Sequence, residues 1–101
     1  MVKKISKHEF QEEVQGFTLV DFYADWCGPC RMLSPIVEDL SNEVNDVNFV
    51  KVNVDDDPEL ASLFGVRSIP TLILFKNGQE VDRIIGFVPK QKLQALIDSH
   101  K

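Results

Sequence analysis

The stretch FTLVDFYADWCGPC, residues 17–30, joins a hydrophobic run to the only two cysteines of the chain. Residues 17–24 are rich in β-branched and aromatic side chains, over a length that suits a buried central strand. From Cys27 onward, hydrophobic residues recur at helical spacing, at Met32, Leu33, Ile36, Val37, Leu40 and Val44. The stretch therefore predicts a strand that leads directly into a helix, with Cys27 and Cys30 at the junction.

The rest of the chain continues this alternation of strands and helices. The patterns predict further strands at 2–5, 47–55, 71–76 and 79–86, and further helices at 6–14, 57–65 and 89–101. Strands that alternate with helices need crossover connections, which make them parallel, whereas the last two strands form an antiparallel hairpin around Asn77-Gly78. The predicted fold is α/β, with a mixed five-stranded sheet and helices on both of its faces.

Local signals mark the ends of these helices. Ser6, with Glu9 three residues later, has the pattern of a capping box. Asp57 is expected to cap a later helix, with Pro58 at its first position. Pro35 lies inside the long helix and removes one hydrogen bond, so we expect a bend there rather than two separate helices.

Size and charge narrow the class of protein. The length of 101 residues predicts a single domain, residues 1–101. The formal net charge of −5 argues against a broad surface for nucleic acid or anionic membranes, because either would need clustered Lys and Arg. No apolar run is long enough to span a membrane, and the N-terminal residues lack the apolar stretch of a secretion signal. Because cysteines are too few for a disulfide-stapled secreted scaffold, we expect a cytoplasmic protein.

Three interpretations of the cysteine pair are open. Free cysteines are often small core residues, but these two lie at a strand–helix junction, where α/β folds place ligand sites. A closed zinc site needs four ligands, and we expect His8 and His100 to be solvated helix residues at opposite ends of the chain. No metal site is therefore expected within one chain, while a cluster shared between two chains stays open. The third interpretation is thiol–disulfide exchange.

Exchange chemistry accounts for each residue of the CGPC segment. Cys27 would lie at a helix N-terminus, where backbone amides and the helix dipole favour a thiolate. Gly28 lets a partner backbone approach, and Pro29 stiffens the turn. Cys30 lies one turn further and is close enough to resolve a mixed disulfide formed at Cys27, which makes the second half of the exchange intramolecular.

Several segments in a fixed order resemble the thioredoxin family: VDFYAD, WCGPC, KVNVDDDP, IPTLILFKNG and a late IIG. The likeness extends over residues 17–86 and more loosely to both ends. It implies a thioredoxin fold, a three-layer α/β/α sandwich with four helices and sheet order 1-3-2-4-5. It also implies a monomeric general protein-disulfide reductase without a bound cofactor, in which Cys27 is the nucleophile and Cys30 the resolving thiol. The implied partners are disulfide-containing proteins and an NADPH-dependent flavoprotein, thioredoxin reductase.

Asp21 interrupts the hydrophobic strand. One interpretation is that strand alternation turns its carboxylate to a solvated face, with Val20 and Phe22 facing the core. The resemblance implies instead a buried aspartate whose pKa is raised by desolvation and which accepts the Cys30 proton, directly or through water. Lys51 matches the family's lysine near that aspartate and would balance its charge, although without the resemblance it is interpreted as a surface lysine.

The resemblance also implies a shallow apolar groove beside the cysteines. Most X-Pro bonds are trans, but thioredoxins have a cis proline facing the thiols at the position of Pro70. Trp26, the single tryptophan, is expected to be exposed as part of a contact surface. The expected substrate-binding residues are Trp26, Gly28, Pro29, Ser68, Ile69, Pro70 and Gly86. Val88-Pro89 stands where the family commonly has a serine or threonine cap, which predicts a weak start of the last helix.

Two other functions fit the same sequence. A net oxidase or isomerase on this fold would run the exchange in other directions, although Gly28-Pro29 between the cysteines favours reduction. A binding module would use the groove to dock partners, and its redox state would only switch affinity. The segment VDDDPE, residues 54–59, lacks the glycine and the distant glutamate of a calcium loop and is interpreted as a turn followed by a helix cap.

Overall fold

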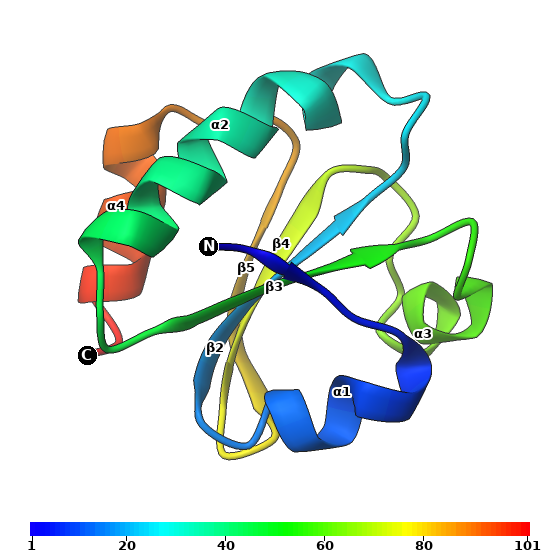
Figure 1. The fold of residues 1–101 in the computed structure, drawn as a ribbon, viewed down its shortest axis with the longest axis horizontal. Coiled ribbons are helices and arrows are strands. Elements are labelled where there is room, and N and C mark those ends of the chain that lie inside the picture. Colours follow the sequence, from blue (N-terminus) through cyan, green and yellow to red (C-terminus); the bar gives the residue numbers. More distant parts are fainter.

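Five strands and four helices follow one another along the chain (Figure 1). They are β1 (Lys3–Lys4), α1 (Lys7–Glu13), β2 (Phe17–Tyr23), α2 (Gly28–Glu43), β3 (Asn48–Asn53), α3 (Pro58–Leu63), β4 (Thr71–Lys76), β5 (Gln79–Ile85) and α4 (Lys90–Asp98). The computed structural model describes all 101 residues. Every predicted element is present, with ends that differ by a few residues from the sequence patterns.

The strands form one mixed sheet in the order β1-β3-β2-β4-β5. β1, β3 and β2 run parallel to one another, whereas β4 runs antiparallel to both β2 and β5. Helices connect the parallel strands, and only the final pair is joined by a tight turn, as the crossover argument predicts. The α/β fold with this strand order is therefore confirmed.

Helices cover both faces of the sheet, which gives three layers (Figure 1). α2 and α4 pack on one face, and α1 and α3 pack on the other. Because side chains alternate along a strand, Leu19 of β2 belongs to the first core and its neighbour Val20 to the second. β2 therefore has no solvated face, and the Asp21 carboxylate is buried with 6% of its surface exposed. The interpretation that Asp21 faces solvent is wrong, because α2 covers that side of the strand.

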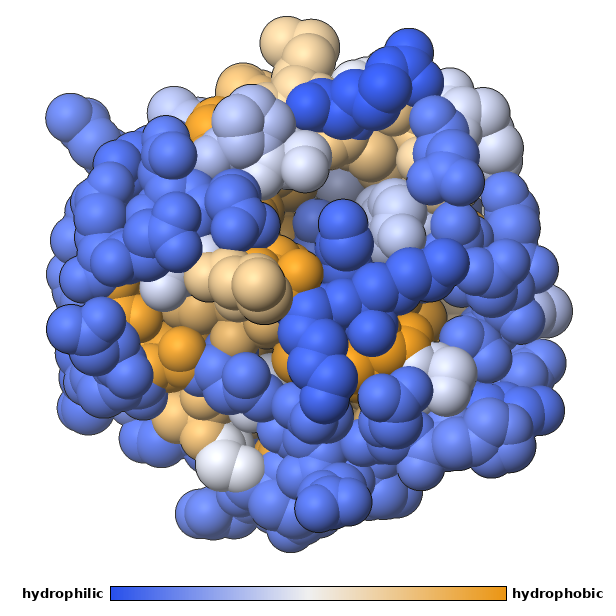
Figure 2. Space-filling view, viewed as in Figure 1, coloured by the Kyte–Doolittle hydropathy of each residue, from blue (hydrophilic) through white to orange (hydrophobic).

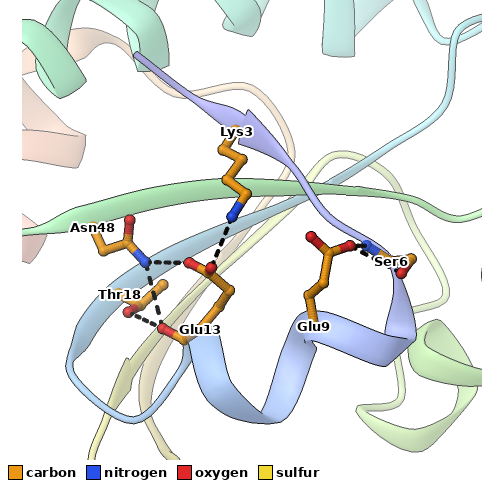
Figure 3. Close-up of polar contacts among 6 residues, drawn as sticks. All are labelled: Lys3, Ser6, Glu9, Glu13, Thr18 and Asn48. Atoms are coloured by element: carbon orange, nitrogen blue, oxygen red, sulfur yellow. Dashed lines mark hydrogen bonds and ion pairs between the residues drawn. The ribbon is translucent and has the colours of Figure 1, made fainter.

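The helix starts agree with the sequence in part. α1 begins with the expected capping box, in which Ser6 Oγ accepts from the His8 N–H. The Glu9 carboxylate accepts in turn from the Ser6 N–H (Figure 3). Asp57 stands at the N-cap of α3, but its side chain makes no capping hydrogen bond, so the expected contact is wrong although the boundary is right. Pro35 lies inside α2, which continues on both sides of it as one helix.

The last residue of α1 ties that helix to three strands (Figure 3). The Glu13 carboxylate accepts hydrogen bonds from Lys3 Nζ of β1 at 3.1 Å and from Asn48 Nδ2 of β3 at 2.9 Å. Its backbone carbonyl accepts from the hydroxyl of Thr18 in β2 at 2.8 Å. These contacts lie at the opposite end of β2 from the cysteines and hold the strand that carries the site.

The hairpin between β4 and β5 turns at Asn77, with φ 53°, and Gly78, with φ 81°. Both residues are in the left-handed region that a type I′ turn requires, and an Asn-Gly pair adopts this region at low cost. The Gly78 N–H also donates to the Val14 carbonyl at 2.9 Å. The predicted hairpin is therefore present, and its turn is docked against the end of α1.

One edge of the sheet is the short strand β1, whose two residues are exposed lysines. Charged residues on a short edge strand discourage pairing with a second chain. Figure 2 shows hydrophilic residues over most of the face seen in Figure 1, with hydrophobic residues in smaller areas between them. None of the four helices combines the length and the apolar character that crossing a membrane requires.

Candidate active site

The two cysteines lie where β2 has ended and α2 begins. Cys27 is the N-cap residue of α2, and Cys30 lies in the first turn. Their sulfur atoms are bonded to each other, so the structure is that of the oxidised chain. Cys27 Sγ also accepts a hydrogen bond from the Cys30 backbone N–H at 3.2 Å. An amide of the first helical turn thus points at Cys27, which favours negative charge on that sulfur once the disulfide is reduced.

The Cys27 side of the disulfide faces the segment before β4. Cys27 Sγ lies 3.7 Å from the Ile69 carbonyl oxygen, and Ile69 packs against the cluster that contains Cys27 and Cys30. The Ile69–Pro70 peptide bond is cis, as the resemblance implies. The Gly86 N–H donates to the Pro70 carbonyl at 2.8 Å. Segments that are far from the cysteines in the sequence therefore meet beside the disulfide.

The Cys30 side of the disulfide faces a pocket of about 210 Å³. The pocket is lined by Asp21, Tyr23, Ala24, Asp25, Cys30, Arg31, Ser34 and Lys51. Within it, the buried Asp21 carboxylate has one oxygen atom, Oδ1, without a hydrogen-bond partner. A buried carboxylate that receives no hydrogen bond from the protein is costly to ionise. Cys27 does not line the pocket, so the two sulfurs have different surroundings.

Two opposing effects set the charge of Asp21. Burial raises the pKa of its carboxyl to about 7, and the Lys51 ammonium acts in the opposite direction. Lys51 is the residue of β3 that pairs with Asp21 of β2, and its Nζ lies 5.4 Å from the centroid of the Tyr23 ring. Lys51 is partly buried beside the pocket. It is therefore not the free surface lysine that the sequence indicates without the resemblance.

Trp26 is exposed, with 69% of its surface accessible, as expected for a contact residue. Its indole N–H donates to the Asp55 carboxylate at 2.9 Å, and Arg31 Nη1 donates to the Asp25 carbonyl at 2.9 Å. These two contacts hold the loop that carries Trp26. Sequence reasoning missed both Asp55 and Arg31, because no local pattern marks a contact across 29 residues or a side chain that turns back to an earlier carbonyl.

The expected groove residues come from three segments of the chain. Trp26, Gly28 and Pro29 lie around the start of α2, Ser68, Ile69 and Pro70 lie before β4, and Gly86 follows β5. Of these, Trp26, Pro29 and Ser68 are exposed, whereas Pro70 is buried. The hydrogen bond from Gly86 to Pro70 and the contact of Ile69 with Cys27 join the second and third segments to the disulfide.

The two histidines lie apart from these groups. His8 is exposed in α1, as predicted. His100 follows α4, and its Nε2 atom lies 2.9 Å from the Asp82 carboxylate of β5. The expectation of a solvated helix residue is therefore wrong for His100, which attaches the end of the chain to the sheet.

The family model named Thioredoxin matches residues 1–99. This chain belongs to the thioredoxin family. The thioredoxin of Chlamydia caviae is 52% identical over 101 residues, which cover 99% of each chain. Thioredoxin 1 of Synechococcus elongatus is 53% identical over 83 residues, which cover 81% of this chain and 78% of that protein. The crystal structure of Malassezia sympodialis thioredoxin matches with a TM-score of 0.91 at 39% identity, covering 99% of this chain and 90% of that one.

The thioredoxin family and the disulfide together define the general chemistry of the site. With its redox pair of Cys27 and Cys30 at the start of α2, this family member is a protein-disulfide oxidoreductase. The thioredoxin resemblance predicted from the sequence segments is confirmed.

Proposed function

We propose that this thioredoxin is a general protein-disulfide reductase, which passes two electrons from its cysteine pair to disulfides of other proteins. The observation that carries the proposal is the asymmetry of the two sulfurs. Cys27 faces an amide of the helix start and the Ile69–Pro70 segment, whereas Cys30 faces the pocket that contains Asp21. This division suits one sulfur that meets the substrate and a second that exchanges a proton inside the protein.

In the first step, the Cys27 thiolate attacks one sulfur of a target disulfide. A bond forms between Cys27 and the target, the target's own S–S bond breaks, and its second sulfur leaves as a thiolate. The Cys30 N–H that points at Cys27 Sγ supports this role, because it stabilises the anion before the attack.

In the second step, Cys30 gives its proton to the Asp21 carboxylate and attacks Cys27 Sγ. The Cys27–Cys30 bond forms, the mixed disulfide breaks, and the target leaves with both of its sulfurs reduced. A carboxyl with a pKa of about 7 supports this role, because it gains and loses a proton near neutral pH. Lys51 then balances the charge of the ionised Asp21.

We assign substrate contact to the groove residues on both sides of the disulfide, which are Trp26, Gly28, Pro29, Ser68, Ile69, Pro70 and Gly86. An extended target segment would lie along the backbone before β4, and the exposed indole of Trp26 would supply apolar contact. Contacts of this kind use backbone and apolar groups and select little by sequence. That property suits a reductase with many protein substrates.

The oxidised pair must be reduced again after each turnover, and we propose an NADPH-dependent thioredoxin reductase as the electron donor. The electrons reside in the two thiols, so the reaction needs no bound cofactor on this chain. We further propose that the chain works as a monomer in the cytoplasm, with Gly28-Pro29 between the cysteines favouring the reducing direction.

The test is NADPH-coupled reduction of a disulfide-containing protein by this chain together with a thioredoxin reductase. Cys27→Ser is expected to abolish turnover. Cys30→Ser keeps the nucleophile but cannot resolve the intermediate, so a covalent adduct with the target should accumulate and be released by dithiothreitol. Mass spectrometry measures this adduct, and its absence from Cys30→Ser would show that Cys27 does not attack first.

The same reagents separate the two competing functions. A binding module would retain its partners when both cysteines are replaced by serine, and the wild-type chain would show no NADPH-coupled turnover. A net oxidase would instead form disulfides in a reduced target protein and would do so without NADPH. Turnover by the wild-type chain that requires both cysteines supports the reductase.

A further inference from the structure

The pocket behind Cys30 contains a contact that the two-step exchange does not use. The Lys51 ammonium lies over the Tyr23 ring, 5.4 Å from its centroid. Asp21 Oδ1 has no hydrogen-bond partner, so the ammonium acts on that oxygen through space and not through a direct bond. A through-space effect depends strongly on distance and on exposure to water. Whatever holds the ammonium in place therefore controls how strongly it acts on Asp21.

The sheet geometry explains how three side chains reach the same pocket. Asp21 and Tyr23 are two residues apart on β2, so they leave the sheet on the same face. Lys51 pairs with Asp21 from β3, and its side chain reaches diagonally to the Tyr23 ring. A lysine side chain is long and flexible, and without a contact it would lean into water. An aromatic face that attracts the cation limits this freedom.

We propose that Tyr23 is a positioning residue for the proton transfer at Asp21, because its ring holds the Lys51 ammonium at the side of the pocket. The inference rests on the proposed role of Asp21 as proton acceptor. Tyr23 also packs against the cluster of Ala24, Cys27 and Cys30. The proposed effect on proton transfer passes through the contact of the ring with Lys51, and it does not require the tyrosine hydroxyl.

Among the charged groups around Asp21, Lys51 is the one that affects the ionisation of the Asp21 carboxyl. The other charged or titratable groups that line the pocket are Cys30 and Arg31 of α2, and Asp25 after β2. From β4, the residue that pairs with Asp21 is the apolar Leu72. Lys51 is the group that lowers the pKa of Asp21, against the effect of burial. Loss of the Lys51 position should therefore raise the pKa of Asp21.

Removal of the ring has a second effect of opposite sign. A smaller side chain at position 23 lets water approach Asp21, and hydration favours the charged carboxylate. A double-mutant cycle separates the two effects. The effect that passes through Lys51 disappears when Lys51 is replaced by methionine, whereas the effect of added water remains in both backgrounds.

The experiment measures the pKa of Asp21 by carbon NMR of its carboxyl group in the oxidised protein, where the cysteines do not titrate. The cycle consists of wild type, Tyr23→Leu, Lys51→Met and the double variant. We compare the change in the pKa of Asp21 caused by Tyr23→Leu in two backgrounds. With Lys51 present this change is expected to be more positive by about 0.5 than in the Lys51→Met background, which is the scale of a partly exposed cation–π contact. Tyr23→Phe is the matched control, because it keeps the ring and should leave the pKa as in wild type.

Two outcomes would overturn the proposal. One is an equal effect of Tyr23→Leu in both backgrounds, and the other is a rise in Tyr23→Phe as large as that in Tyr23→Leu. Tyr23→Trp provides a second measurement that retains an aromatic face, and the pKa of Asp21 in this variant should not exceed the wild-type value. Relative to its shift in the Lys51→Met background, the pH midpoint of the resolving step should move up with Tyr23→Leu, and it should stay in place with Tyr23→Phe.

The NMR cycle also separates this inference from the proposed function. If Asp21→Asn leaves the resolving rate unchanged, Asp21 is not the proton acceptor, and that part of the proposed function fails. The NMR cycle still measures separately whether Tyr23 controls the effect of Lys51 on the pKa of Asp21. If Asp21→Asn slows resolution but the cycle shows no coupling between Tyr23 and Lys51, the role of Asp21 as proton acceptor is supported. The positioning role of Tyr23 is then wrong.

Discussion

The Asp21 carboxyl lies in the pocket beside Cys30 with 6% of its surface exposed, and burial raises its pKa to about 7. In an unfolded chain an aspartate has a pKa of about 3.9. Between these two values the unfolded chain is ionised at Asp21 while the folded chain is protonated, so the folded state binds more protons. The free energy of unfolding therefore falls as the pH rises from about 4 to about 7, and above that range the whole of this loss of stability is present.

Asp21→Asn is expected to raise the free energy of unfolding at about pH 8 by roughly 2–4 kcal/mol, because asparagine cannot ionise. Below about pH 4 the wild-type side chain is neutral in both states, and the difference should become small. Urea unfolding at several pH values measures the effect. A gain of the same size at low and at high pH would show that burial of a charge is not its cause.

The same variant is expected to slow resolution of the mixed disulfide by about a hundredfold, while formation of the mixed disulfide keeps its rate. Rapid-quench kinetics with a single target disulfide measures the two steps separately. Asp25→Asn is the matched control, because Asp25 also lines the pocket but is exposed to solvent. Similar slowing in both variants would point to a general charge effect and not to proton transfer.

At the scale of single elements, the helices begin in different ways. α1 has a complete capping box, whereas α3 and α4 have no side-chain hydrogen bond at their N-caps. The absence at Pro89 agrees with the weak start expected for the last helix. In α2 the N-cap side chain is Cys27, so the position that stabilises the helix start in other proteins carries one sulfur of the redox pair here.

Ser6→Ala is expected to lower the free energy of unfolding by about 1 kcal/mol, because it removes the hydroxyl that accepts from the His8 N–H. Denaturant unfolding measures the change. Ser62→Ala in α3 is the control, since Ser62 is exposed and lies inside its helix, and its effect should be smaller. Equal losses from the two substitutions would mean that the cap of α1 does not contribute.

At the scale of the whole molecule, the sheet separates two hydrophobic cores. One contains Leu40 of α2, and the other contains Leu60 of α3. β2, β3 and β4 each contribute residues to both cores, so neither core can be completed without the same central strands. We therefore propose that residues 1–101 form one domain that unfolds in a single cooperative transition.

Leu40→Ala and Leu60→Ala are each expected to lower the free energy of unfolding by about 2–5 kcal/mol, because each leaves a cavity in one of the two cores. Circular dichroism, which follows the helices, and Trp26 fluorescence, which follows the site, should give the same midpoint in each variant. Different midpoints from the two probes would contradict a single domain.

The sequence by itself determined the order of the elements and the place of the thiols. Hydrophobic spacing, the Asn77-Gly78 pair and the capping pattern of Ser6 with Glu9 are local signals, and local signals are readable because they act within a few residues. The strand–helix junction at Cys27 follows from such signals. The family resemblance then led to the cis bond before Pro70, which has no local signal, and it supported the burial of Asp21, which lies inside a hydrophobic strand.

Tertiary structure alone decided which distant groups meet at the site. Trp26 contacts Asp55, and Lys51 reaches the Tyr23 ring, because the order of the strands brings these segments together. His100 is a further example. The local sequence indicates a solvated residue, but in the fold its side chain contacts Asp82 of β5. Burial depends on what covers a side chain, and the cover comes from parts of the chain that no short stretch of sequence contains.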